Sequence, residues 1–266
     1  MVIDSDAGNE IDDQFALAYA LNASDQVETV AVYAAPFATS RFSVADRVRH
    51  ALEECGRVVS LCNLREPPTL LPGADAYLPT RALPATSPAA DHLIALASAP
   101  ATVAASEAGR PLYVVVIGCT TNIAAALLLA PEIAGRIAVV GDAAYPHHWP
   151  WRNRSYNLEQ DVRAARVLFD RAPLVYIPGY QVAEQLTLMQ EEAEQQVTPC
   201  GELGAFLWQL FPRCHPRQAC SHVMWDIGQY RPPDRTSLDL LARRPDPTSD
   251  PGPALAPTQL SPPGHA

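Results

Sequence analysis

Apolar residues along this chain form two kinds of pattern, and together they predict strands and helices in alternation. Continuous apolar runs bounded by turn residues are typical of parallel strands buried on both faces. Such runs occur at Pro111–Gly118, Ile137–Asp142 and Pro173–Pro178. An alternating β-branched run at Val27–Tyr33 predicts another strand, and Val2-Ile3 begins a short first one. Helical spacing of apolar residues predicts helices over residues 15–21, 44–55, 89–106, 123–129 and 190–212.

Two further segments complete the expected fold. Arg57–Leu61 is apolar and β-branched, which predicts a strand, and the proline-rich residues 64–90 are expected to form a long loop. Strands that alternate with helices indicate an α/β fold, with a mostly parallel central sheet and helices on both faces. Residues 1–230 are expected to form this domain. Residues 231–266 hold nine prolines with little periodicity, which predicts a disordered tail.

Charge and composition exclude several classes of partner. The 266 residues carry a net charge of -10, and all 19 basic residues are Arg. An acidic chain without basic clusters is a poor ligand for nucleic acid or an anionic membrane. The sequence has no apolar run of membrane-spanning length and no signal-peptide pattern, so we expect a cytoplasmic protein. Cys214, His215, Cys220 and His222 mimic a zinc cluster, but their spacing fits no standard zinc finger.

The densest chemistry lies at the start of the chain. Five carboxylates fall within ten residues, at Asp4, Asp6, Glu10, Asp12 and Asp13, between the first strand and the first helix. Ligands of α/β sheets bind outside the carboxyl ends of the strands. Carboxylates crowded there oppose one another's ionisation, and a hard cation such as Ca²⁺ or Mg²⁺ offsets that cost. Helix capping alone requires one or two acids rather than five.

This stretch resembles the opening motif of the inosine–uridine-preferring nucleoside hydrolase family, Asp-Thr-Asp-Pro-Gly-x-Asp-Asp. Asp4-Ser5-Asp6-Ala7-Gly8 and Ile11-Asp12-Asp13 match it, with Asn9-Glu10 as a two-residue insertion. The resemblance recurs at Cys119-Thr120-Thr121-Asn122, at Asn157 and at Asp226, and covers roughly residues 1–230. It implies a Rossmann-like nucleoside hydrolase fold and hydrolysis of ribonucleosides to ribose and free base, as in purine and pyrimidine salvage.

The resemblance also implies a role for each matching residue. Asp6, Asp13, the Thr121 carbonyl and Asp226 would hold Ca²⁺ and its bound water, with Asp6 as the general base. Asp12 would bind the ribose 2′-hydroxyl, and Asn157 the 3′ side. The partner would be a small-molecule nucleoside, and the chain would form a homo-oligomer, since members of the family are often dimers or tetramers.

Aromatic and amide residues between 145 and 157 suit a flat base and a sugar, and Tyr156 is a candidate substrate contact there. The chain departs from the family at two places: Ser155 stands where the family has Glu, and Trp225 where it has His. Trp225 has no titratable proton. His222, one helical turn earlier, and His147 and His148 are therefore candidates for the acid that protonates the leaving base.

Two other functions remain open from the sequence. Asp4-Ser5-Asp6 after a strand also suits an aspartyl phosphatase with Asp4 as nucleophile and Mg²⁺ as cofactor. That hypothesis leaves Asp12-Asp13 unexplained, and the chain has no Lys to bind phosphate. A non-catalytic, degenerate ribosyl-binding homologue is the other alternative, favoured by Trp225 and Ser155.

Overall fold

The computed structural model describes residues 1–23, 27–146, 148–149, 154–211 and 220–230. The predicted tail at 231–266, together with His147, Cys214 and His215, lies outside the described residues. The strands are β1 (Val2–Ser5), β2 (Ala31–Ala34), β3 (Thr69–Pro72), β4 (Leu112–Val116), β5 (Ile137–Ala143), β6 (Leu174–Pro178), β7 (Thr187–Met189) and β8 (Ser221–Val223).

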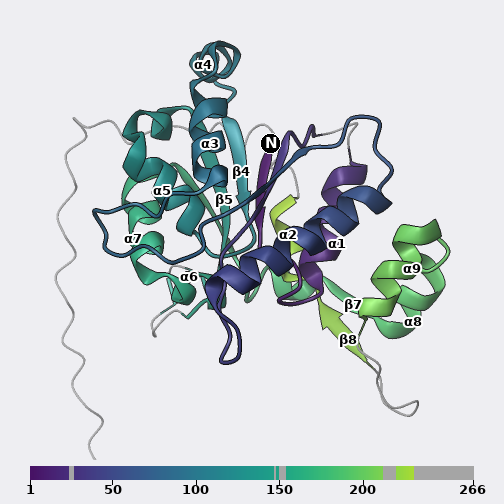
Figure 1. Cartoon of the computed structure of the whole chain (residues 1–266). Coiled ribbons are helices and arrows are strands. Elements are labelled where there is room, and N and C mark those ends of the chain that lie inside the picture. Colours follow the sequence, from purple (N-terminus) through teal and green to yellow (C-terminus); the bar gives the residue numbers. More distant parts are fainter. Residues whose placement is uncertain (24–26, 147, 150–153, 212–219, 231–266) are drawn as a thin grey trace, which may run out of the picture. The chain divides into compact units, whose positions relative to one another are not determined.

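Helices connect these strands and cover the sheet (Figure 1). They are α1 (Asp12–Asn22), α2 (Val44–Leu61), α3 (Pro88–Ser98), α4 (Pro100–Glu107), α5 (Thr121–Leu129), α6 (Tyr156–Gln160), α7 (Val162–Arg171), α8 (Gln190–Glu192) and α9 (Gly201–Leu210). Short helical segments of 3₁₀ or π type are η1 (Pro131–Gly135), η2 (Ala183–Gln185), η3 (Ala193–Val197) and η4 (Trp225–Tyr230).

Six strands form one parallel sheet in the order β3-β2-β1-β4-β5-β6. The predicted α/β fold with a mostly parallel sheet is therefore confirmed. The chain runs outward from β1 in one direction and from β4 in the other, so the topological switch point lies between these two strands. Ligands of doubly wound sheets bind at this point, beyond the carboxyl ends of the strands. A separate antiparallel pair joins β7 to β8, with Leu188 opposite His222.

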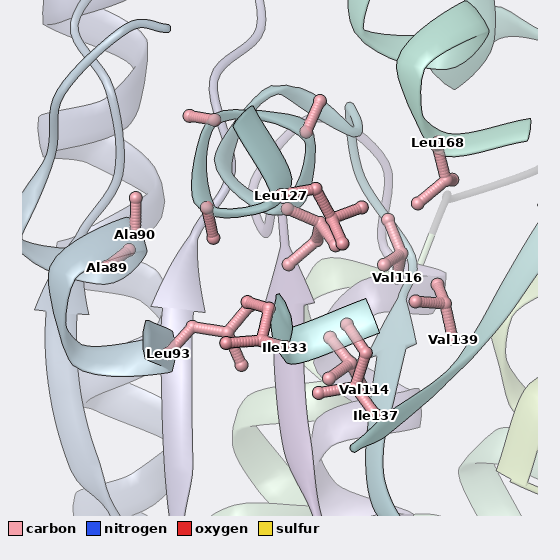
Figure 2. Packing of buried hydrophobic residues seen from close by; sticks show 14 of the residues in the cluster. Ala89, Ala90, Leu93, Val114, Val116, Leu127, Ile133, Ile137, Val139 and Leu168 are labelled. Atoms are coloured by element: carbon pink, nitrogen blue, oxygen red, sulfur yellow. The ribbon is translucent and has the colours of Figure 1, made fainter. Parts of the chain in front are cut away.

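The core lies on both faces of the sheet, because successive strand residues point to opposite sides. On one face Val2, Val114 and Val139 pack against α3, α5 and α7. Figure 2 shows this layer, with Leu127 of α5 and Leu168 of α7 near the strand residues Val116 and Val139. On the other face Ile3, Val115 and Val140 pack in one cluster with residues of α1, α2 and α9.

Three predicted elements differ from the structure. The strand predicted at Arg57–Leu61 is wrong, because these residues are the last turns of α2, which buries Val48, Ala51, Cys55 and Val58 at helical spacing. The third strand lies instead at Thr69–Pro72, inside the predicted loop. It is a partly exposed strand at the edge of the sheet, where its terminal proline is tolerated. The helix predicted over residues 89–106 is two helices that meet at Ala99 and Pro100, since proline disfavours helix in the residue before it.

Candidate active site

The acidic turn between β1 and α1 is built on one glycine. Gly8 has φ +89°, a left-handed conformation that favours glycine, and a Cβ there would meet His50 Nε2 at 2.6 Å. The turn is held from within: Asn9 N–H donates to the Asp6 carbonyl at 3.1 Å, and Asn9 Nδ2 donates to Asp6 Oδ2 at 3.1 Å. Ser5 Oγ donates to Asp13 Oδ1 at 2.7 Å. These contacts fix the Asp6 and Asp13 carboxylates relative to each other.

The end of β4 lies directly against this turn. Backbone N–H groups of Ile117 and Gly118 donate to the Asp4 carbonyl at 2.9 and 3.1 Å. A Cβ on Gly118 would meet the Asp6 nitrogen at 2.9 Å, so only glycine allows this approach. The switch point of the sheet therefore brings the first acidic turn beside the segment that leads to Thr121.

A cavity of about 310 Å³ opens at this edge of the sheet. Its acidic wall holds the predicted residues Asp6, Asp12, Asp13 and Asp226, together with Asn9 and Glu10. The carboxyl ends of the other strands contribute Ile117 after β4, Ala144 after β5, and Gly179 and Tyr180 after β6. Trp225 and the segment Arg154–Asn157 complete the lining.

Three of the carboxylates form a compact group. Ligand oxygens of Asp12, Asp13 and Asp226 all lie within 4.8 Å of one another, and the three residues are only 3%, 2% and 5% exposed. Asp12 and Asp13 come from the first turn of α1, and Asp226 from η4, which packs on α1. Residues more than two hundred positions apart thus meet at one point. That is the spacing expected of ligands around one ion.

Burial raises the pKa of three carboxyl groups in the acidic wall. It raises the pKa of Asp6 to about 8 with help from the Asp12 charge, and the pKa of Asp12 to about 7 with help from Glu10. The pKa of Asp13 is also well above its usual value, because of burial and then the charges of Asp6 and Asp12. Only protonation or a bound cation relieves such crowding.

Thr121 and Asn122 lie at the start of α5, and their side chains support the fold. The Thr121 hydroxyl donates to Asp161 Oδ2 at 2.9 Å. Asn122 Nδ2 donates to Asp4 Oδ1 at 2.8 Å, while Asn122 Oδ1 accepts from Ala74 N at 2.8 Å. Thr121 is fully buried and is not one of the cavity-lining residues. Only its backbone carbonyl is left for the predicted ligand role, which stays a prediction.

Asn157 is held at the edge of the cavity by its own amide. Asn157 Nδ2 donates to the Ile117 carbonyl at 2.9 Å, which leaves its Oδ1 as an acceptor for a ligand. Neighbouring Ser155 lines the cavity and is 5% exposed, and its Oγ has no hydrogen-bond partner among the described residues. Tyr156 also lines the cavity, and its hydroxyl lies 3.5 Å from Asn9 Oδ1.

Aromatic rings pack together beside the cavity, and one of them, Tyr180, was not singled out by the sequence analysis. Trp225 packs edge-on against Tyr180, with ring centroids 5.4 Å apart. Tyr180 stacks on Tyr145 at 4.4 Å, and Tyr145 stacks on Trp149 at 4.7 Å. Tyr180 follows the predicted strand Pro173–Pro178 by two residues, so the rule that ligands bind beyond strand ends was a signal that pointed to it.

Arg154 is a second residue that the sequence analysis missed. It lines the cavity and pairs with Glu159 through two contacts of 2.8 and 2.9 Å. Arg154 directly precedes Ser155, but the resemblance gives no role to an arginine there, so nothing in the sequence pointed to it.

The candidate acids lie at different places. His222, on β8, is not one of the cavity-lining residues, but a ring nitrogen lies within 4.8 Å of carboxylate oxygens of Glu10 and Asp12. His148 is exposed and is likewise not part of the lining. Asp4, the nucleophile of the phosphatase hypothesis, is fully buried outside the cavity lining and bonded to Asn122.

Comparisons with known proteins identify the fold. A plant nucleoside hydrolase has a TM-score of 0.60 at 16% identity, over 91% of this chain and 77% of that one. The purine-preferring ribonucleoside hydrolase from Gardnerella vaginalis has a TM-score of 0.52 at 24% identity, over 79% and 69%. An inosine-uridine preferring nucleoside hydrolase from Bacillus anthracis has a TM-score of 0.58 at 17% identity, over 86% of this chain and 79% of that one. At these identities the likeness shows the fold.

No curated protein matches the chain. The model of the family described as inosine-uridine preferring nucleoside hydrolase, however, matches residues 1–229. The resemblance in the sequence and the predicted enzyme class, an N-ribosyl hydrolase, are thereby confirmed. The chain therefore belongs to the inosine-uridine preferring nucleoside hydrolase family.

Proposed function

We propose that this protein hydrolyses the N-glycosidic bond of ribonucleosides, giving ribose and the free base, with Ca²⁺ bound at the acidic wall. The observation that carries the proposal is the group formed by Asp12, Asp13 and Asp226. Three buried carboxylates converge within 4.8 Å in a cavity whose other side is aromatic. A cation, a sugar and a flat base together suit such a cavity.

The donor set fits a hard cation. Every candidate ligand atom is an oxygen. The carboxylates are so deeply buried that solvent screens their charges only weakly. Asp13 and Asp226 would be ligands, with Asp6 and the Thr121 carbonyl as the family resemblance implies, and Asp12 lies close enough to contribute. Bound there, the ion would neutralise the wall and lower the pKa of a water ligand.

Asp6 is the general base in this proposal. It is 1% exposed, lines the cavity, and its Oδ2 is held by Asn9. A carboxylate in this position accepts the proton of the attacking water while that water adds to the anomeric carbon.

Two residues would hold the ribose. Asp12 accepts a hydrogen bond from the 2′-hydroxyl, and Asn157 Oδ1 accepts one from the 3′ side while its amide stays on Ile117. These contacts orient the anomeric carbon toward Asp6. Cleavage of the glycosidic bond leaves positive charge on the sugar, which the carboxylates stabilise electrostatically.

The base would lie against Trp225 and Tyr180. Their rings offer stacking area beside the acidic wall. Trp225 cannot protonate a departing purine, so the chain lacks at that position the acid that the family supplies. Trp225 and Ser155 both favour the alternative function, a degenerate homologue that binds ribosides without cleaving them. Asp4 lies outside the cavity lining, which disfavours the phosphatase alternative.

A substrate panel tests the proposal. Inosine, uridine, adenosine, guanosine, cytidine, 4-nitrophenyl riboside and 4-nitrophenyl phosphate are each incubated with the protein and Ca²⁺ or Mg²⁺. We expect cleavage of at least the nitrophenyl riboside and none of the phosphate ester. Binding of ribosides without cleavage would favour the degenerate alternative, and cleavage of the phosphate ester alone would favour the phosphatase.

A further inference from the structure

Asp12 belongs to two groups of side chains that lie close enough together to hold a metal ion. One is the carboxylate group with Asp13 and Asp226, and the other joins Asp12 to Glu10 and His222. In the second group, too, all ligand atoms lie within 4.8 Å of one another. We propose that Glu10, Asp12 and His222 form a second cation site, for a divalent transition-metal ion, which shares the Asp12 carboxylate with the Ca²⁺ site.

The state of the His222 ring supports the proposal. His222 Nε2 is closed off from solvent and has no hydrogen-bond partner among the described residues. A buried polar atom without a hydrogen-bond partner is unfavourable, and a bound ion would satisfy it. The ring contacts Phe211 edge-on at 6.5 Å, and the backbone of His222 is paired with Leu188 in the β7–β8 ribbon. A ring held by a strand and a neighbouring aromatic side chain is a preorganised ligand.

The spacing also fits ligands around one ion. Zn–N and Zn–O bonds of about 2.0–2.2 Å allow two ligands of one ion to be at most about 4.4 Å apart. The three ligand atoms lie within 4.8 Å of one another, an upper bound slightly wider than this. Glu10 is exposed, so its side chain has the freedom to close the remaining gap.

The chemistry of the donors separates the two sites. The first group offers oxygen only and suits Ca²⁺, whereas an imidazole nitrogen with two carboxylates suits Mn²⁺ or Zn²⁺. A carboxylate bridging two ions about 3.5–4 Å apart is a common arrangement in two-metal sites. Glu10 belongs to the two-residue insertion, Asn9-Glu10, that this chain has relative to the family's opening motif. The additional ligand would therefore come from a residue of the insertion.

The inference does not depend on the reaction proposed above, and metal binding tests it directly. The full chain is stripped with chelator, saturated with Ca²⁺ and titrated with Mn²⁺ by calorimetry, and the ions per chain are counted by native mass spectrometry. We expect one Mn²⁺ per chain in addition to one Ca²⁺. His222→Ala and Glu10→Gln should each weaken Mn²⁺ binding about tenfold or more, with little effect on Ca²⁺.

A matched control removes a different imidazole. His92, which hydrogen-bonds the Tyr33 hydroxyl at 2.9 Å, lies on α3 and is not part of either metal-binding group. His92→Ala should leave Mn²⁺ binding unchanged. Because Glu10 is exposed, Glu10→Gln should fold like the parent and provide a test even if His222→Ala unfolds.

Two results overturn the proposal. One is Mn²⁺ that binds only by displacing Ca²⁺, with one ion per chain in total. The other is Mn²⁺ affinity unchanged in both folded variants. If Ca²⁺ fails to bind while Mn²⁺ binding still depends on His222 and Glu10, the second site stands and the calcium part of the proposed function fails.

Discussion

The two ends of the cavity differ in how closely they follow the family. The acidic end keeps every matching carboxylate, on the β1–α1 turn and on η4, and packs them to 5% exposure or less at Asp12, Asp13 and Asp226. The other end has Ser155 and Trp225 at positions where the resemblance to the family implies Glu and His. We therefore expect that changes at the acidic end affect cation binding, and that changes at the other end affect departure of the base.

Removal of a carboxylate from the acidic end should have the largest effect. Asp13→Asn and Asp226→Asn each take one anionic ligand from a buried group, so Ca²⁺ affinity should fall by about 100-fold or more. Calorimetry with Ca²⁺ measures this. Asp91→Asn, in the first turn of α3, is the matched control and should leave affinity unchanged. Unchanged Ca²⁺ affinity in both variants would show that Asp13 and Asp226 do not bind the ion.

The replacement of the family's His by Trp225 should make the rate of hydrolysis depend strongly on the leaving group. A positioned general acid contributes about 10²–10⁴ in rate. We expect slow hydrolysis of inosine and much faster hydrolysis of 4-nitrophenyl riboside, because its phenolate leaves without protonation. Trp225→His should raise kcat for inosine and leave that for the nitrophenyl riboside nearly unchanged.

Brisk inosine cleavage by the parent would contradict the idea that the acid is missing. His222→Ala and His147→Ala would then show whether either histidine supplies it. A rate insensitive to both changes would end the leaving-group argument.

Stability should depend on pH through the acidic end. Burial raises the pKa of Asp4 and Asp12 to about 7 and that of Asp6 to about 8, from a usual value of 3.8. The folded chain therefore holds protons that the unfolded chain releases, and stability present below about pH 4 is lost as pH rises to about 8.

In chelator, the melting temperature should fall by at least about 3 °C between pH 5 and pH 8. Ca²⁺ should remove most of this fall, because it replaces the protons. Differential scanning fluorimetry with and without Ca²⁺ measures the effect. A melting temperature that rises over this range in chelator would contradict the assigned burial of charge.

The smallest expected effect concerns Ser155. Its buried hydroxyl has no hydrogen-bond partner among the described residues, and Ser155 lines the cavity. Ser155→Glu restores the residue of the family, and KM for ribonucleosides should fall several-fold through one additional hydrogen bond to the substrate. The 5′-deoxy analogue of the same nucleoside is the control and should show no gain. The additional hydrogen bond is expected to the ribose 5′-hydroxyl, so an equal gain for both substrates would show that residue 155 does not contact this group.

The position of the acidic end at the edge of the sheet could be predicted because its segments follow strands, one short and one with a long apolar run. Asp6 follows β1 and the Thr121 segment follows β4, so the carboxyl-edge rule brings them together. Asp226 was placed by resemblance alone, because it reaches the site through the packing of η4 on α1, which local pattern does not encode. Tyr180 was missed although it follows the end of a predicted strand, and Arg154 was missed because no pattern in the sequence pointed to it.

The mistaken strand at Arg57–Leu61 has a different cause. A short β-branched run with Val58 and Val59 satisfies strand propensity, but α2 continues through it because Cys55 and Val58 extend its buried helical face. Tertiary burial overrode local preference there. The true β3 was hidden by its prolines, which an edge strand tolerates and a central strand does not.

Hydrolysis of 4-nitrophenyl riboside before and after chelation tests the central claim most directly, since it needs the acidic end and bypasses the altered one. We predict release of nitrophenolate that is lost in chelator and restored by Ca²⁺ in the parent, but not restored in Asp13→Asn. Hydrolysis that persists in chelator, or no hydrolysis by a folded, Ca²⁺-bound protein, would contradict the account.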